Sequence, residues 1–308
     1  MRIATFNLQN LRLRQRDGQA VLDGAIDEDR SGPKRPTELA QADRVETARV
    51  IASAQADIVA LQEVFDLAAL DFFHDRYLMD AGSPVYPHRY CYAGNDGRGL
   101  NVAALSHQAP LNARSHANLT GTDLGFSDLS TDLRNHPIFR RDCLELEFET
   151  VTLFVCHFKA PYPDVAKAHA VREAEARAVR KIVESRFPEP DQERWIILGD
   201  LNEPASGSAR SRSALAPLMS GFAVDLLDRL PDGSDWTYEL PDNHLHTRPD
   251  RMLVSPRVAA DYPDTVPQIV RAGMGTVMHG SDERRVGTTL AGPHASDHAL
   301  VYADFPGL

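Results

Sequence analysis

The sequence TLFVCH (residues 152–157) leads through AKAHAVREAEARAVRKIVESRF (166–187) to WIILGDLN (195–202), and this succession decides the fold. The first and last segments are short apolar runs with the length of a strand. The segment between them mixes apolar and charged residues as a long amphipathic helix does. A strand, a helix and a second strand in this order indicate a sheet with a helix packed outside it.

The same order occurs nearer the N-terminus. IATFN (3–7) and DIVALQE (57–63) are expected strands, and residues 37–55 between them have the pattern of an amphipathic helix. Two such units predict an α/β protein in which two layers of sheet have helices outside.

Further runs fit strands of the same sheets. RYCYAG (89–94) and LNVAALS (100–106) flank a turn and predict a hairpin, and CLELEFETVTLFVCHF (143–158) predicts another with its turn near Glu149 and Thr150. DRMLVS (250–255) and HALVYADF (298–305) are short and β-branched enough to be strands.

The polar stretch at residues 11–36 is too long for an ordinary connection. It is either a functional flap over a site or a disordered insertion. Since the chain has no internal repeat, low-complexity segment or linker, we expect residues 1–308 to form a single domain with a loop insertion at about 11–36.

Composition excludes several classes of protein. The 308 residues are 43% hydrophobic, which is enough for a sizeable core, but no run of eighteen apolar residues predicts a membrane span. The N-terminus lacks the pattern of an export signal, so we expect a cytoplasmic protein with no membrane contact and no obligate protein partner. The three cysteines lie in strand-like contexts without CxxC spacing and read as buried, reduced thiols.

The net charge of −11 would repel a polyanion at long range and disfavours general coating of DNA. Arginines cluster after the first expected strand and after the GDLN turn, at Arg12, Arg14, Arg16, Arg210 and Arg212. They form either a solvated loop or a local cationic groove that binds phosphate.

Polar residues with metal-binding or proton-transfer chemistry stand at the ends of the apolar runs. They are Asn7, Glu63, His157, Asp200 and Asn202, with Asp297 and His298 just before the last run. A sheet gathers residues that end its strands at one edge. The arrangement predicts a metal-dependent hydrolase.

The motif GDLNEP (199–204) is the most informative of these strand ends. Asp200 and Asn202 are two residues apart in extended geometry and therefore point to the same side. The carboxylate can take a proton from water while the amide binds phosphoryl oxygens, which suits hydrolysis of a phosphate ester. The alternative is an Asx turn that ends a strand.

The other strand ends complete such a site. Glu63 is a hard oxygen ligand of the kind that Mg²⁺ accepts, with Asn7 beside it, although a glutamate alone is more often an exposed residue. Asp297 is a candidate ligand and His298 a candidate proton carrier. Asp250, before MLVS, is placed to hold the ring of His298 in one tautomer.

Two further residues keep two interpretations each. His157 is either catalytic or a hydrogen-bonded residue of the core, and Lys159 is either a phosphate contact or a surface charge.

The order of these motifs resembles that of the endonuclease/exonuclease/phosphatase superfamily, over almost the whole chain. The matching features are an N-terminal strand with Asn7, then LQE, HFK, GDLN, D-x-x-L-V-S and SDH. The resemblance implies a four-layered α/β sandwich, in which two packed sheets of mixed or antiparallel strands are flanked by helices, with one site at the strand ends.

The resemblance also implies roles for the residues. Glu63 would be the principal ligand of Mg²⁺, for which Mn²⁺ can substitute, with Asn7 and Asp297 in or next to its shell. Asp200 would activate or orient the attacking water, and Asn202 would bind the phosphate. His298 and Asp250 resemble the histidine–aspartate pair of the superfamily.

Within the superfamily, His157 resembles the histidine of the pancreatic deoxyribonuclease and sphingomyelinase-like branches, and it could act as general acid. Asp96-Gly97-Arg98-Gly99 resembles a turn of many bacterial members, so Arg98 is a candidate phosphate contact or a structural residue. The aromatic and basic loops with which the repair enzymes grip DNA have no match.

We therefore expect a Mg²⁺-dependent phosphodiesterase whose substrate is a phosphate ester such as a nucleotide or a nucleic acid, with small or single-stranded esters favoured over long duplexes. Either Asp200 or His298 is the general base. The alternative within the superfamily is a phosphomonoesterase. A non-catalytic scaffold should have lost its ligands, and the two-metal phosphoesterase fold needs GNH and GHxH motifs that are absent from the sequence.

Overall fold

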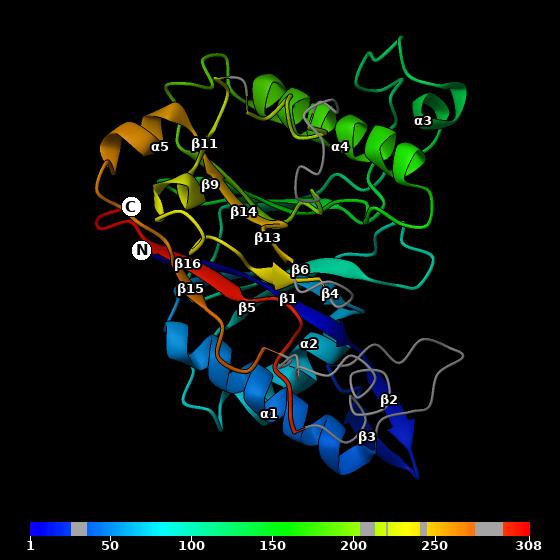
Figure 1. The fold of residues 1–308 in the computed structure, drawn as a ribbon, viewed down its shortest axis with the longest axis vertical. Coiled ribbons are helices and arrows are strands. Elements are labelled where there is room, and N and C mark those ends of the chain that lie inside the picture. Colours follow the sequence, from blue (N-terminus) through cyan, green and yellow to red (C-terminus); the bar gives the residue numbers. More distant parts are fainter. Residues whose placement is uncertain (26–35, 204–212, 220, 241–244, 275–291) are drawn as a thin grey trace.

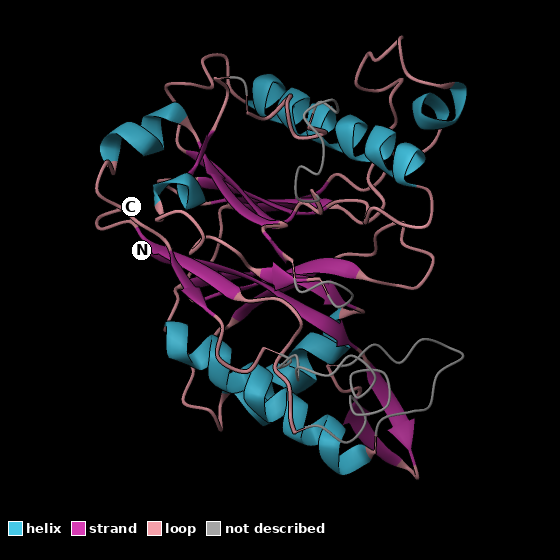
Figure 2. Ribbon diagram, viewed as in Figure 1, coloured by secondary structure: helices cyan, strands magenta, loops and turns pink. Residues whose placement is uncertain are grey.

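Two six-stranded sheets pack face to face, and helices cover the outer face of each, in this computed structural model (Figures 1 and 2). The structure describes residues 1–25, 36–203, 213–219, 221–240, 245–274 and 292–308. The layers run helix, sheet, sheet, helix, and the predicted four-layered sandwich is confirmed.

The strands of the first sheet come from both ends of the chain. Their order is β15 (Gln268–Val270), β16 (Leu300–Asp304), β1 (Arg2–Leu11), β4 (Ile58–Val64), β6 (Asn101–Ser106) and β5 (His88–Cys91). β1 and β4 are parallel and the other pairs are antiparallel, so the sheet is mixed.

The second sheet is built mainly from the middle of the chain. Its order is β11 (Val224–Asp225), β14 (Asp250–Val254), β10 (Trp195–Asp200), β9 (Thr152–His157), β8 (Cys143–Glu147) and β7 (Asn112–Ser115). β9 and β10 are parallel, as β1 and β4 are in the first sheet. Both predicted hairpins are present, as β5–β6 and β8–β9.

The helices divide between the two outer faces. Those on the side of the first sheet are α1 (Thr37–Ala54), α2 (Leu67–Phe73) and the π-helical turn η1 (His74–Leu78). Those on the side of the second are α3 (Thr131–Asn135) and α4 (Val165–Arg186). The short helix α5 (Pro256–Asp261) and the 3-10 turn η2 (Leu226–Arg229) instead pack at the end of the sandwich, where Leu226, Leu227 and Val258 join the core between the sheets. Both predicted long helices are therefore present, as α1 and α4.

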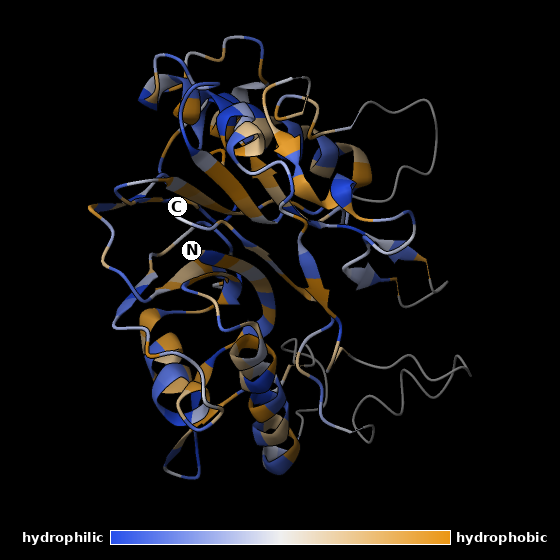
Figure 3. Ribbon diagram, turned by 90° about the vertical axis from the view of Figure 1, so that its left-hand side faces the viewer, coloured by the Kyte–Doolittle hydropathy of each residue, from blue (hydrophilic) through white to orange (hydrophobic). Residues whose placement is uncertain are grey.

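The apolar residues form three cores because each sheet is buried on both faces. One core lies between the sheets and includes Ile58 of β4 and Ile196 of β10. The other two lie under α1 and α2 and under α4. The strands are accordingly hydrophobic along most of their length in Figure 3.

The first half of the expected insertion at residues 11–36 is an ordered hairpin, β2 (Leu13–Arg16) with β3 (Gln19–Leu22). The buried Asp23 accepts salt bridges from Arg14 and Arg16, at 2.7 and 3.1 Å, which support the backbone pairing of the two strands. These two arginines are therefore engaged in holding the hairpin. Residues 26–35 of the same stretch, and Arg210 and Arg212, lie outside the described residues.

The structure adds a short hairpin and also bears on the expected absence of a membrane span. A short hairpin, β12 (Tyr238–Glu239) with β13 (His246–Thr247), contacts both sheets: Tyr238 bridges to His298 before β16, and Thr237 bonds to Asp250 of β14. Within the described ranges, no helix is both long and apolar enough to cross a membrane.

Candidate active site

Three of the predicted residues lie side by side across the second sheet. His157 ends β9, Asp200 ends β10 and Asp250 begins β14, and Asp200 is the register partner of both others. Because β14 runs antiparallel to β10, its first residue falls at the edge where β9 and β10 end. This edge carries two carboxylates and one imidazole in a row.

Gly199 allows β10 to carry Asp200 at this position. Its φ is +137°, and a Cβ atom there would lie 2.0 Å from the carbonyl oxygen of Cys156 in the neighbouring strand. A side chain at this position would push β10 away from β9. The glycine of the GDLN motif thus keeps Asp200 in register with His157.

Asn7 connects this edge to the first sheet. Its Nδ2 donates to Asp200 Oδ2 at 3.1 Å, and its Oδ1 accepts from the backbone N–H of Gln9 at 3.0 Å. Both ends of the amide are thus engaged by protein groups. Asn7 is thus placed to orient Asp200, and because Oδ1 keeps a second lone pair, its expected role next to the metal shell stays a prediction.

The carboxylate of Asp200 is the point at which the site residues meet. Oδ1 accepts from the backbone N–H of Asn202 at 2.9 Å. Oδ2 lies 3.4 Å from His157 Nε2 and 3.9 Å from His298 Nε2. Burial raises the pKa of Asp200 to about 6, and the charge of Asp250 contributes to the same shift.

His298 and Asp250 form the expected pair. His298 Nδ1 lies 2.8 Å from Asp250 Oδ2, which also accepts from Thr237 Oγ1 at 2.6 Å. Burial alone would lower the pKa of His298, but the charges of Asp250, Asp297 and Asp200 outweigh it and hold that pKa well above its usual value. These carboxylates favour the protonated form of His298, whose Nε2 lies 3.9 Å from Asp200 Oδ2.

His157 differs from His298 in its protonation. Burial lowers its pKa well below the usual value, and the positive charges of Arg141, His298 and Arg98 lower it further. Its Nδ1 is buried and has no hydrogen-bond partner in the described part of the chain. Both effects favour the neutral imidazole of His157, and its expected role as general acid stays a prediction.

Glu63 and Asp297 form a second carboxylate group at the end of the first sheet. Glu63 has a φ of +63°, and its Oε2 accepts from the backbone N–H of Asn10 at 3.1 Å. The backbone N–H of Asp297 donates to Gln9 Oε1 at 3.1 Å. Burial raises the pKa of Glu63 to about 7, and the charge of Asp297 is the next contribution.

The donors of this second group fit a hard divalent cation. The charges of Asp297 and Asp200 both raise the pKa of Glu63, so a cation at these oxygens would relieve the repulsion between like charges. Among residues that the structure describes, no group of three or more His, Cys, Asp or Glu side chains has a metal-binding arrangement. Mg²⁺ keeps several waters and binds through one or two carboxylates, so two suffice for it.

Three predicted phosphate contacts differ in how many of their hydrogen-bond donors are already used within the protein. Asn202 Nδ2 donates one hydrogen to the carbonyl of Phe158, at 3.0 Å. The exposed Arg98 lies 3.5 Å from Asp96, and its charge lowers the pKa of both His157 and Lys159. Lys159 Nζ already donates to the carbonyls of Ala160 and Tyr162, which leaves it less free than Arg98 to bind a phosphate.

Two residues of the site have no distinctive sequence signal. Arg141 is only 3% exposed, pairs with Asp96 at 3.2 Å, and lowers the pKa of Glu63 and His157 through its charge. Thr237 holds Asp250. The only hint in the sequence is that FRRD (139–142) precedes a strand and WTY (236–238) precedes the DRMLVS segment.

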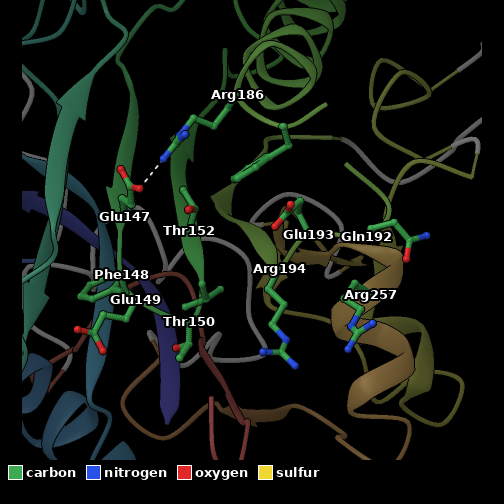
Figure 4. Close-up of a pocket in the computed structure, with 12 residues that line it drawn as sticks. Glu147, Phe148, Glu149, Thr150, Thr152, Arg186, Gln192, Glu193, Arg194 and Arg257 are labelled. Carbon is green, nitrogen blue, oxygen red and sulfur yellow. Dashed lines mark hydrogen bonds and ion pairs between the residues drawn. The ribbon is translucent and has the colours of Figure 1, made fainter. Parts of the chain in front are cut away.

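A separate hollow of about 520 Å³ opens at the far end of β9 and β10 (Figure 4). Its arginines are paired with carboxylates, Arg186 with Glu147, and Arg194 and Arg257 with Asp261. None of the predicted site residues lines it. The hollow therefore belongs to the opposite edge of the sheet.

The family model described as Endonuclease/Exonuclease/phosphatase family matches residues 4–298. The chain belongs to this family. Members of the superfamily are hydrolases that act on phosphoester bonds, and they generally use divalent metal ions, commonly Mg²⁺. No curated protein matches the chain.

Solved structures with the same fold cover almost the whole chain. An endonuclease/exonuclease/phosphatase family protein from Leptotrichia buccalis C-1013-b has a TM-score of 0.58 and 14% identity, with 99% of this chain and 98% of that chain covered. Truncated TDP2 of Caenorhabditis elegans has a TM-score of 0.54 and 16% identity, with 98% and 96% covered. Beta toxin 275-280 of Staphylococcus aureus has a TM-score of 0.57 and 15% identity, with 98% and 99% covered. At these identities the likeness shows the fold alone.

Proposed function

We propose that the protein is a divalent-metal-dependent phosphodiesterase that hydrolyses its substrate by in-line attack of water. One observation carries the proposal: side chains from both sheets converge on the carboxylate of Asp200. The carboxylates of Glu63 and Asp297 belong to the same site, since the charges of Asp297 and Asp200 both raise the pKa of Glu63. Family membership supports phosphoester hydrolysis in general. The diester and the metal dependence are the proposed additions.

In this proposal Asp200 accepts the proton of the attacking water. Its pKa of about 6 leaves it ionised at neutral pH and more basic than an ordinary aspartate. Asn7 Nδ2 and the N–H of Asn202 hold its two oxygens and orient it. Of the two candidate bases we propose Asp200, because the carboxylates around His298 favour its protonated form.

The imidazolium of His298 then donates Nε2–H to the leaving oxygen, or to a phosphoryl oxygen as negative charge develops there. Asp250 fixes the ring and stabilises its charge through Nδ1. His157 Nε2, 3.4 Å from Asp200 Oδ2, would lie beside the base without transferring a proton. The role of general acid, expected for His157, is thus assigned to His298.

Glu63 and Asp297 would hold the divalent ion, and Asn202 and Arg98 would bind the remaining phosphoryl oxygens. When bound, the ion supplies positive charge that neutralises a non-bridging phosphoryl oxygen. Arg141, buried beneath this edge, adds fixed positive charge to the same region.

Bis-p-nitrophenyl phosphate and p-nitrophenyl phosphate, assayed with Mg²⁺, Mn²⁺ or EDTA, test the proposal. We expect the diester to be preferred, EDTA to abolish turnover and Mg²⁺ to restore it. Asp200→Asn and His298→Ala should each reduce kcat by at least about 100-fold. Asp132→Asn, which changes an exposed carboxylate of α3, is the control and should retain wild-type rates.

Full activity in EDTA would refute the metal dependence, and preference for the monoester would refute the diester assignment. Wild-type rates in either site variant would refute the roles of Asp200 and His298.

A further inference from the structure

The β12–β13 hairpin contacts both members of the histidine–aspartate pair. Thr237 Oγ1 donates to Asp250, and the carbonyl of Thr237 accepts from the N–H of Ala299 at 2.8 Å. The ring centroids of Tyr238 and His298 are 4.8 Å apart, and the backbones of the two residues form an isolated bridge. The hairpin is therefore part of the wall of the site.

An aromatic column stands on this hairpin next to Thr237. The rings of Trp236 and His246 are parallel within 4°, with centroids 4.0 Å apart. The guanidinium carbon of Arg271 lies 4.2 Å from the centre of the Trp236 ring. Two groups this close to one ring must occupy its opposite faces, so Trp236 is sandwiched. Among the described residues, His246 is the outermost ring of the column.

The column is held rigidly at its other end. Arg271 donates from Nε and Nη2 to the carbonyl of Trp236, at 3.1 and 2.8 Å, and from Nη2 to the carbonyl of Ser234 at 2.5 Å. The guanidinium is thus fixed to the residue on which it stacks. His246, in contrast, is exposed.

Packing accounts for only part of this arrangement. An aromatic pair on a hairpin stabilises the pairing of its strands, and Trp236 with His246 does so here. Packing does not require the outermost ring to stay exposed on the hairpin whose Tyr238 contacts His298. A planar group of a ligand can continue the stack at that ring, since base–aromatic stacking is tolerant of sequence and needs only a free π-face.

We propose that His246, supported by Trp236 and Arg271, is a subsite for a planar aromatic group of the substrate, namely a nucleobase. The inference rests on the proposed function and narrows its substrate to nucleotide esters or single-stranded nucleic acid. The net charge of −11 agrees with this choice, because it disfavours long duplex DNA.

A matched pair of substrates tests the subsite. Thymidine 5′-(p-nitrophenyl phosphate) and methyl p-nitrophenyl phosphate carry the same leaving group, but only the first carries a base. We expect the wild-type protein to prefer the first in kcat/KM by about tenfold or more. His246→Ala should remove most of that preference while leaving the rate with the methyl ester unchanged.

His107→Ala is the control, because it removes an exposed histidine ring at the opposite end of the first sheet, after β6. It should leave both rates unchanged. Equal kcat/KM for the two esters, or an unchanged preference in His246→Ala, would overturn the subsite.

Fluorescence separates the subsite from the catalytic proposal. The chain has two tryptophans, and Trp195 is fully buried, so a ligand at His246 should alter the emission of Trp236. Thymidine 5′-monophosphate should change the emission and deoxyribose 5-phosphate should not, and Trp236→Phe should abolish the change. His246→Ala should weaken the binding of thymidine 5′-monophosphate by about fivefold or more.

A fluorescence response to the nucleotide without turnover of either ester would support the subsite and refute the proposed function. Turnover of both esters, with equal responses to the two phosphates, would refute the subsite and leave the proposed function standing.

Discussion

Replacing Arg44 by lysine should both destabilise the protein and weaken its binding of a divalent ion. Arg44 lies in α1, is fully buried, and donates five hydrogen bonds of 2.6 to 3.0 Å to backbone carbonyls. These carbonyls belong to residues 8, 9, 10, 23 and 24. Burial lowers the pKa of the guanidinium only to about 10, so it stays charged at neutral pH.

The magnitude follows from the number of donors. A lysine ammonium has three N–H groups, so at least two of the five carbonyls would lose their partner. Each unsatisfied buried carbonyl costs about 1 to 3 kcal/mol, and the free energy of unfolding should therefore fall by about 2 to 6 kcal/mol. Arg229→Lys is the matched control, because Arg229 donates to three carbonyls, which an ammonium can satisfy in number.

The effect on the ion follows from the turn that Arg44 holds. Gln9 and Asn10 are both left-handed, with φ of +47° and +60°, and they contact Asp297 and Glu63 respectively. A looser turn should move these carboxylates and weaken Mn²⁺ binding, measured by electron paramagnetic resonance, by about tenfold. Urea denaturation gives the stability. A loss below about 1 kcal/mol together with unchanged Mn²⁺ affinity would refute the reasoning.

Three further outcomes are expected. Asp250→Asn keeps an acceptor for His298 but removes the charge that raises the pKa of His298. We expect kcat/KM to fall by about 10² to 10⁴ and the alkaline limb of the pH profile of kcat/KM to move to lower pH. A pH profile of wild-type shape would contradict this prediction. Thr237→Val removes one hydrogen bond to that carboxylate and should lower the free energy of unfolding by about 2 kcal/mol in urea, whereas an unchanged midpoint would argue against the bond. Burial raises the pKa of Glu175 from 4.5 to about 7 in the folded state. The folded protein then holds this proton more tightly than the unfolded chain, so stability should fall by up to about 3 kcal/mol as pH rises from about 4.5 to 7. Glu175→Gln should reduce the dependence of the free energy of unfolding, measured in urea, on pH between about 4.5 and 7. A pH dependence equal to that of the wild type would exclude Glu175 as its cause.

Much of the site's layout could be predicted because residues that end parallel strands share an edge. His157 and Asp200 end the parallel strands β9 and β10, whereas Asn7 follows an apolar run inside β1 of the other sheet and reaches Asp200 across the sandwich. The motif order also indicated the family and the sandwich. Individual roles for the site residues stay predictions until they are measured.

The remaining features depend on contacts between segments distant in sequence. Arg44 stands among charged residues of an amphipathic helix, and nothing local distinguishes it from an exposed arginine. Arg141 is similar, because its burial depends on Asp96 and on the carbonyl of Phe158. The protonation states of His157 and His298 depend on the sum of surrounding charges, which a strand-end motif does not contain.

The bond between Asn7 and Asp200 crosses from one sheet to the other, and so does the pair of His298 and Asp250. A ligand that touches both groups would act as a clamp across the sandwich. Saturation with such a ligand at 100 times its Kd should raise the free energy of unfolding by about 2.7 kcal/mol, because a protein whose sheets have separated no longer holds the ligand. Ligand binding to this protein and the packing of its two sheets are therefore thermodynamically linked.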